Sequence, residues 1–379
     1  MAQSRLSAGL ENTTQPGSSG FLRNLHIDWP LMTGLIALSI MGLIVLYSAS
    51  GENWSTVSRQ MIWMSIAFLV MFFIAQIPPR SIQFWTPWVF GGGVLLLLGV
   101  LFFGEVSKGA QRWLNLGLFR VQPSEIMKFA CPMMVAWYMA EKPLPPSTGR
   151  VLIALLILAV PVALIARQPD LGTSILVASA GIFVLLLTGI SWFLIGGFAV
   201  LVAAAAPVVW FFYMHDYQRQ RVLTFLNPES DPLGSGYHII QSKIAIGSGG
   251  LYGKGWLNGT QSQLDFLPER STDFIFAVFA EEFGLVGVLV LLSLYLYIVI
   301  RGLVIAHQAQ GTFARLLAGS LVLTFMVYIV VNIGMVSGLL PVVGVPLPLV
   351  SYGGTSMVTL MIAFGILMSI QTHRKLLTS

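Results

Sequence analysis

Long apolar runs alternate with short polar connections along most of the chain. A helix that spans a membrane needs about 20 mostly apolar residues, and about ten runs approach that length. They are Leu31–Tyr47, Met61–Ile77, Phe84–Phe103, Glu125–Ala140, Val151–Ala166, Leu171–Ile190, Phe193–Met214, Phe274–Ile300, Phe313–Ser337 and Thr355–Ile370. The pattern predicts an all-α polytopic membrane protein with about ten transmembrane helices.

One polar stretch, residues 215–273, interrupts this pattern between the seventh and eighth runs. It has roughly the length at which a loop between membrane helices counts as long. Long loops in compact proteins usually carry function. Asp273, at the end of this stretch, places an acid where the loop meets the next apolar run and is the first candidate for catalysis. The alternative is that Asp273 caps that helix, a role that suits an aspartate.

Composition agrees with a membrane protein, since 56% of the residues are hydrophobic and 9% are charged, against about 25% charged in soluble domains. The net charge of +5 does not indicate nucleic acid, because the basic residues are dispersed among short loops. The single Cys131 excludes an internal disulfide. The five histidines are scattered, so no zinc or iron site is expected.

The positive-inside rule orients the chain. An even number of helices places both termini on one side, and the segments on that side carry more Lys and Arg than acids. We therefore expect a cytoplasmic tail over residues 1–29 and one transmembrane domain over 30–379, with 215–273 as a periplasmic loop. Lys108, Arg112 and Arg120 then lie in a short outer loop, against the rule, which favours an anionic ligand on the outer face.

Charges within membrane helices are costly, so their default interpretation is functional. Glu125 and Lys128 are three residues apart and share a helix face; the alternative is a purely structural ion pair. Helical geometry directs Glu281 and Glu282 roughly 80° and 180° away from Asp273. We expect those two glutamates to join a polar network or a groove between helices.

Glycine and proline mark two further segments. Residues 247–255 are rich in glycine but lack the P-loop pattern, so a flexible, turn-rich segment is the alternative to phosphate binding. Residues 338–354 contain several helix breakers, and such irregular backbone needs protein or water to satisfy it. We expect it to fold over an outer cavity. From the residues alone, both an enzyme acting on a lipid-linked anion and a carrier for one fit.

Several motifs, in order, resemble the SEDS family of shape, elongation, division and sporulation proteins. They are Lys108–Trp113, Gln122–Lys128, Gln168–Thr173, Glu269–Phe274, Gly344–Pro348 and Ser351–Gly354. The resemblance begins near Asp28 and covers nearly all of the remaining chain. Residues 78–80 and 217–221 favour the elongation branch over the division branch.

This resemblance implies a peptidoglycan glycosyltransferase of the bacterial inner membrane that polymerises lipid II on the periplasmic face. It places the family's catalytic acid on Asp273, the functional tryptophan on Trp113 and a cavity pair on Glu125 and Lys128. Further candidates for substrate binding are Arg112, Gln122, Ser124, Gln168, Asp170, Arg219, Arg221 and Lys243. No residue is assigned to a metal, although an acid can hold Mg or Mn beside a pyrophosphate.

The expected chemistry needs a base and a positive site. Asp273 would take the proton from the acceptor hydroxyl, while Arg112, Lys128, Arg219 and Arg221 would hold the departing pyrophosphate. An α-linked donor that gives a β linkage inverts in one displacement, so no enzyme nucleophile is required.

The resemblance also implies partners: a class B penicillin-binding protein and the elongation proteins MreC and MreD. Two alternatives remain open from the sequence. One is a lipid II flippase, since charged groups among ten helices also suit a transporter. The other is a non-catalytic scaffold for the penicillin-binding protein.

Overall fold

The computed structural model describes residues 26–374 apart from 108–109, 116–119, 215, 231–234 and 264–268. Residues 1–25 of the expected tail and Lys108 therefore lie outside the described residues. The helices are α2 (Trp29–Ala49), α3 (Trp54–Ala75), α4 (Pro79–Phe103), α5 (Pro123–Ala140), α6 (Thr148–Arg167), α7 (Leu171–Leu187), α8 (Trp192–Val208), η1 (Val209–Tyr213), α9 (Asp216–Leu226), η2 (Pro228–Ser230), α10 (Ser235–Ser248), α11 (Thr260–Gln263), α12 (Ile275–Gln308), α13 (Thr312–Val336) and α14 (Gly354–Thr372). The strands are β1 (Glu105–Ser107), β2 (Ala110–Asn115) and β3 (Arg120–Val121).

The predicted multi-pass helical architecture is confirmed. Each predicted apolar run coincides with a helix, and within the described ranges seven helices are long and apolar enough to cross a membrane. Helix α7 is apolar but shorter. Helix α3 begins at Trp54, ahead of the predicted Met61, because Asn53 caps it by accepting from Ser55 N. The count of ten spans stays a prediction.

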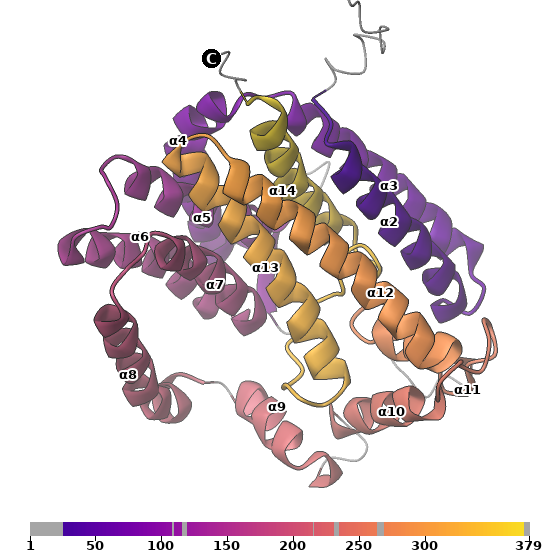
Figure 1. The fold of residues 1–379 in the computed structure, drawn as a ribbon. Coiled ribbons are helices and arrows are strands. Elements are labelled where there is room, and N and C mark those ends of the chain that lie inside the picture. Colours follow the sequence, from indigo (N-terminus) through magenta and orange to yellow (C-terminus); the bar gives the residue numbers. More distant parts are fainter. Residues whose placement is uncertain are drawn as a thin grey trace, which may run out of the picture.

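Helix α13 forms the centre of the bundle. It packs against α5, α7, α12 and α14, and Figure 1 shows it crossing between α12 and the α5–α7 side. Helices α2 and α3 flank α12 and α14 on the other side (Figure 1). Side chains on the faces of α5, α7 and α12 that pack against α13 therefore meet in the interior of the bundle.

A small antiparallel sheet, in the order β1-β2-β3, joins α4 to α5. The prediction of an all-α chain missed it. Glu105 stabilises the sheet by accepting from Asn115 Nδ2 at 3.1 Å and by pairing with Arg120 at 3.4 Å. Arg120, one of the basic residues that broke the charge rule, is thus engaged within the sheet and is exposed.

The glycine-rich segment 249–255 docks on a break in α12. Gly284 has φ 62° and ψ −164°, which ends one helical stretch and begins another. The carbonyls of Glu281 and Glu282 accept from Lys254 N and Gly255 N at 3.0 Å each. The amides after the break, Leu285 and Val286, donate to Gly250 O and Leu251 O at 3.0 Å each.

Four backbone hydrogen bonds therefore satisfy the groups that the break would otherwise leave without partners. Gly253 permits this approach, because a Cβ there would lie 2.1 Å from Glu282 O. The segment is rich in turns, as predicted, and these contacts give it a structural role; phosphate binding stays a prediction.

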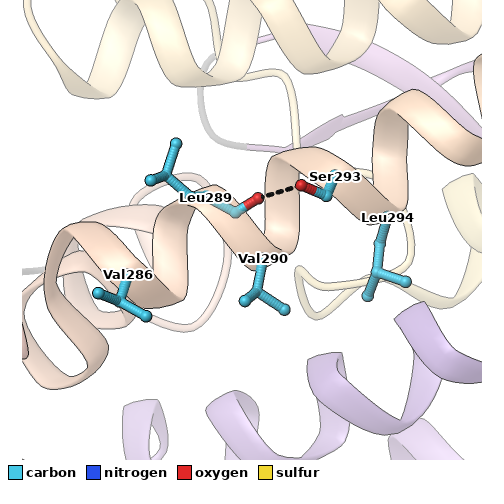
Figure 2. A pocket seen from close by; sticks show the side chains of 5 residues that line it. All are labelled: Val286, Leu289, Val290, Ser293 and Leu294. Carbon is cyan, nitrogen blue, oxygen red and sulfur yellow. Dashed lines mark hydrogen bonds between the residues drawn. The ribbon is translucent and has the colours of Figure 1, made fainter.

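The outer face of α12 carries a shallow hollow of about 400 Å³. Figure 2 shows it between Val286, Leu289, Val290, Ser293 and Leu294. Its one hydroxyl, on Ser293, is engaged by Leu289 O at 2.7 Å. This apolar surface offers nothing to an anionic reactant, so the candidate site lies elsewhere.

Candidate functional site

Asp273 lies immediately before α12 but does not cap it. The N-cap residue is Phe274, and no side chain makes a capping hydrogen bond there. The Asp273 backbone carbonyl accepts from Asn332 Nδ2 at 3.0 Å, and the same amide donates to Val345 O at 2.8 Å. The capping alternative is therefore wrong, and a fully buried amide on α13 fixes the position of Asp273.

Residues 337–353, here called the cover loop, contact the backbone just before Asp273, while the outer cavity expected beneath 338–354 stays a prediction. Ser351 Oγ donates to Thr272 O at 2.6 Å, and Tyr352 N donates to Ser271 O at 2.9 Å. A Cβ on Gly344 would lie 3.5 Å from Asp273 Oδ2. The cover loop thus contacts the candidate base directly.

Glu125 and Lys128 form the ion pair that their spacing predicts. Lys128 Nζ lies 2.6 Å from Glu125 Oε1, and both residues are buried. The ammonium also lies 5.3 Å from the centre of the Tyr328 ring, a favourable cation–π distance. Glu125 Oε2 is buried without a hydrogen-bond partner, so one oxygen of the pair stays available to a ligand.

Helix α13 connects this pair to Asp273. Tyr328, which faces Lys128, and Asn332, which holds Asp273, are four residues apart and share one helix face. One helical turn is about 5.4 Å long. The Lys128 ammonium and the Asp273 backbone carbonyl therefore contact neighbouring positions along the same side of α13.

Arg112 and Asp170 bring the small sheet onto the start of α7. Arg112 Nη2 donates to Pro169 O at 3.0 Å, and its Nε lies 3.6 Å from Asp170 Oδ2. Asp170 also caps α7 by accepting from Thr173 N at 3.3 Å, so one carboxylate both caps the helix and pairs with Arg112. A Cβ on Gly172 would lie 2.7 Å from Val343 O, which places this cluster beside the cover loop.

The other motif residues have structural partners. Gln168 is buried and donates to Leu97 O at 3.0 Å, while Gln122 donates to Ser124 Oγ at 3.2 Å. Trp113 pairs with Glu105 in the sheet and is half-buried. These contacts hold the sheet and the start of α5 beside the cluster.

The three basic candidates from the long loop differ in position. Arg219 donates to Trp210 O and Phe211 O at 2.9 Å each; these carbonyl contacts tie α9 to η1. Arg221 lies on α9, but its side chain is outside the described residues. Lys243 lies against the cover loop, because a Cβ on Gly338 would meet Lys243 Cε at 2.1 Å. Of the three, the structure brings Lys243 toward the site.

The expectation of a polar network fits Glu281. It accepts from Lys254 Nζ at 2.7 Å, Thr260 Oγ1 at 3.0 Å and Gln261 N at 3.1 Å. Glu282 accepts from Ser48 Oγ on α2. Glu281 therefore helps to position the loop on α12, while Glu282 joins α12 to α2.

His238 on α10 stacks on Phe274 with ring centroids 5.7 Å apart. Burial lowers the pKa of His238 below its ordinary value, and the nearby Glu269 partly opposes this shift. No sequence pattern singled out this contact.

Among the residues that the structure describes, no three His, Cys, Asp or Glu side chains cluster as a metal site. The unpartnered, buried Glu125 Oε2 is a hard oxygen donor of the kind that Mg or Mn prefers. It can contribute to a cation that a pyrophosphate holds in part.

Sequence reasoning missed Tyr328 and Asn332. Asn332 is an amide inside an apolar run, which by itself marks a functional position in a membrane helix. Its spacing of four from Tyr328 was the available signal that one face of this helix is special.

The family comparison matches most of the chain. A family model described as "Cell cycle protein", covering FtsW, RodA and SpoVE, matches residues 29–376. The chain belongs to this family, the SEDS family. Peptidoglycan glycosyltransferase MrdB of Escherichia coli (strain K12) is 57% identical over 366 residues, which cover 97% of this chain and 99% of the relative. Peptidoglycan glycosyltransferase RodA of Treponema pallidum is 33% identical, covering 92% and 98%.

Solved structures share the fold. The crystal structure of Thermus thermophilus rod shape determining protein RodA matches with a TM-score of 0.69 at 26% identity, covering 92% of this chain and 98% of that chain. A chain from a solved structure of a peptidoglycan synthase complex, described as showing the structural coordination of polymerization and crosslinking, also matches. Its TM-score is 0.79 at 28% identity, and the match covers 92% of this chain and 99% of that chain. The SEDS chain described here is a RodA-type peptidoglycan glycosyltransferase and a multi-pass membrane protein.

Proposed function

We propose that Asp273 is the general base of a lipid II polymerase. The acceptor 4-hydroxyl attacks the anomeric carbon of the donor, the bond to undecaprenyl pyrophosphate breaks, and Asp273 takes the hydroxyl proton. Configuration inverts in this single displacement, so no covalent enzyme intermediate forms. The supporting observation is that Asp273 is held by Asn332 beneath the cover loop, on the face of α13 that Lys128 also approaches.

The pyrophosphate needs positive charge as it leaves. Three basic residues are placed to supply it. Lys128 faces Tyr328 on α13, Arg112 pairs with Asp170 at the start of α7, and Lys243 lies against the cover loop. We assign them this role. Arg219 is the weaker candidate, because carbonyls of η1 engage its donors.

Orientation and partners follow from the same proposal. We place the loop that carries α9–α11 in the periplasm and both termini in the cytoplasm of an inner membrane, as the charge rule requires. Transpeptidation would come from a class B penicillin-binding protein, within elongation machinery that includes MreC and MreD. The likeness to a chain from a peptidoglycan synthase complex supports a partner of this kind.

The decisive experiment follows glycan chains from purified lipid II on a gel. Asp273→Asn should reduce polymerisation at least about 100-fold, the usual contribution of a general base. Glu52→Gln removes an exposed acid from the same end of the bundle and should leave the rate unchanged. Normal chains from Asp273→Asn would refute the assignment.

Three further assays test the alternatives and the need for a cation. Assays with and without the penicillin-binding protein separate catalysis from scaffolding, because a scaffold would tolerate Asp273→Asn. Assays with EDTA and with added Mg or Mn show whether a cation assists. Transport of lipid II across liposomes without chain growth would instead support a flippase.

A further inference from the structure

A polar cavity of about 550 Å³ lies at the end of the bundle opposite Asp273. It forms where α4 and α13 begin and where α5 and α14 end. Figure 1 shows the ends of α4 and α14 together on the side of the chain termini, away from α9–α11. No step in the proposed reaction uses this cavity.

Two guanidinium groups, from opposite ends of the chain, line the cavity. Arg80 follows the first residue of α4, and Arg374 follows the end of α14. No Asp or Glu lines the cavity, and within the described ranges no carboxylate pairs with either arginine. Arg374 Nη1 donates to the neutral Gln308 Oε1 at 2.7 Å, while Arg374 Nε is buried without a partner. Among the residues that the structure describes, no carboxylate therefore compensates either charge.

The start of α13 adds a third source of positive potential. Its N-cap is Gly311, which has no side chain to cap the helix, although Ser, Thr, Asp or Asn usually occupies that position. Thr312, Phe313 and Ala314, the first turn, all line the cavity. First-turn amides have no helical acceptor and carry the positive end of the helix dipole. A Cβ on Gly311 would meet nothing within 4 Å, so the approach is open.

His373 forms a fixed part of the rim. Its Nδ1 lies 3.1 Å from Ser369 O, and its ring stacks on His26 with centroids 3.9 Å apart. The positive-inside rule accounts for basic residues near a membrane surface. It does not account for two unpaired arginines and an uncapped helix start that converge on one hollow.

We propose that this cavity binds a phosphate group, supplied by the headgroup of an anionic phospholipid or by free phosphate. Arginine forks and helix N-termini are the groups that proteins use for phosphate. The location, at the membrane-facing rim of a polytopic bundle, suits a lipid headgroup. This site does not depend on the assignment of Asp273 or on the polymerase mechanism.

The test uses the purified full chain, stripped of lipid, with native mass spectrometry to count bound lipid. Phosphatidylglycerol is titrated against phosphatidylcholine of the same acyl chains. Wild type should prefer phosphatidylglycerol, and Arg80→Gln/Arg374→Gln should weaken its binding at least about tenfold, since hydrogen bonds to charged groups are lost. Arg315→Gln, which removes an exposed charge from the same end of α13 outside the cavity, should change binding less than about twofold.

A second variant, Thr312→Asp, separates a loss of lipid binding from a loss of folding. An acid in the first turn stabilises a helix but repels a phosphate, so this variant should keep its melting temperature and still lose the preference. Displacement of phosphatidylglycerol by inorganic phosphate would identify free phosphate as sufficient; failure to displace it would identify the lipid as the source. The proposal is overturned if wild type shows no preference, if Arg315→Gln loses as much binding as the double variant, or if Thr312→Asp binds normally.

Discussion

The buried side-chain amide of Asn332 holds the backbone carbonyl of Asp273 at 3.0 Å. This amide group thereby joins the candidate base to α13. It also donates to Val345 O, so Asn332 holds the cover loop on α13 as well. A helix that contacts neither reactant in the proposal thus fixes the backbone from which the Asp273 side chain extends.

Replacement of Asn332 by leucine should therefore impair both stability and polymerisation. Two buried carbonyls would lose their donor, at a cost of about 1–3 kcal/mol each, and Asp273 would lose its fixed position. We expect a lower melting temperature, and a lower kcat when the assay runs well below that temperature. Val330→Leu, on the exposed face of the same helix, is the control. A wild-type rate from Asn332→Leu would show that this tie is dispensable for catalysis.

The Glu125–Lys128 pair should show strong coupling in a double-mutant cycle. Lys128→Met alone leaves a buried carboxylate uncompensated, which costs about 3–5 kcal/mol. Adding Glu125→Gln removes that charge and should restore most of the lost stability, measured by unfolding in micelles. Polymerisation should stay at least about tenfold low in both Lys128 variants, because the charge opposite the pyrophosphate is absent. Normal activity in the double variant would reduce the pair to a structural role.

Gly253→Ala should detach the glycine-rich segment from α12. Its φ of 79° strains any other residue, and a Cβ would collide with Glu282 O; a strained backbone position alone costs about 1–3 kcal/mol. We expect a lower melting temperature and faster proteolysis of the loop. Gly247→Ala is matched, since a Cβ there meets nothing within 4 Å. Equal behaviour of the two variants would contradict the docking role.

Stability should fall as the pH drops below about 6.5, the ordinary pKa of histidine, because His238 resists protonation in the folded chain. Its folded-state pKa is lowered by burial, so the unfolded state binds the proton more readily. The contribution is fully present above the unfolded pKa and is lost toward lower pH. The melting temperature of His238→Gln should depend less on pH between about 7 and 5 than that of wild type. Parallel profiles would exclude His238 as the titrating group.

The sequence predicted the helices because a membrane leaves few options: each spanning segment must be apolar and must satisfy its own backbone. It did not predict the break at Gly284, since a single glycine in an apolar run indicates only a small loss of helix propensity. The break persists because residues 250–255 supply the missing hydrogen bonds. Those partners lie about thirty positions away in the sequence, and periodicity carries no information about them.

The candidate site was predictable to a similar degree. The ion pair between Glu125 and Lys128 could be predicted from their spacing of three residues on one helix. The Arg112–Asp170 contact required the sheet to fold back onto α7, which the all-α interpretation did not contain. Arg219 was chosen for its charge, but its partners are carbonyls of the preceding turn. Charge alone does not show whether an arginine meets a ligand or its own backbone.

The break at Gly284 divides α12 into a shorter helical stretch, residues 275–283, and a longer one, residues 285–308. The shorter stretch begins just after Asp273, and its Glu281 and Glu282 carbonyls accept from Lys254 N and Gly255 N. At the start of the longer stretch, Leu285 N and Val286 N donate to Gly250 O and Leu251 O. Amide protons of these two segments should accordingly exchange with solvent as a single cooperative unit. Residues 250–255 therefore bridge the two stretches, so the angle between them, and with it the position of Asp273 relative to the longer stretch, depends on this bridge.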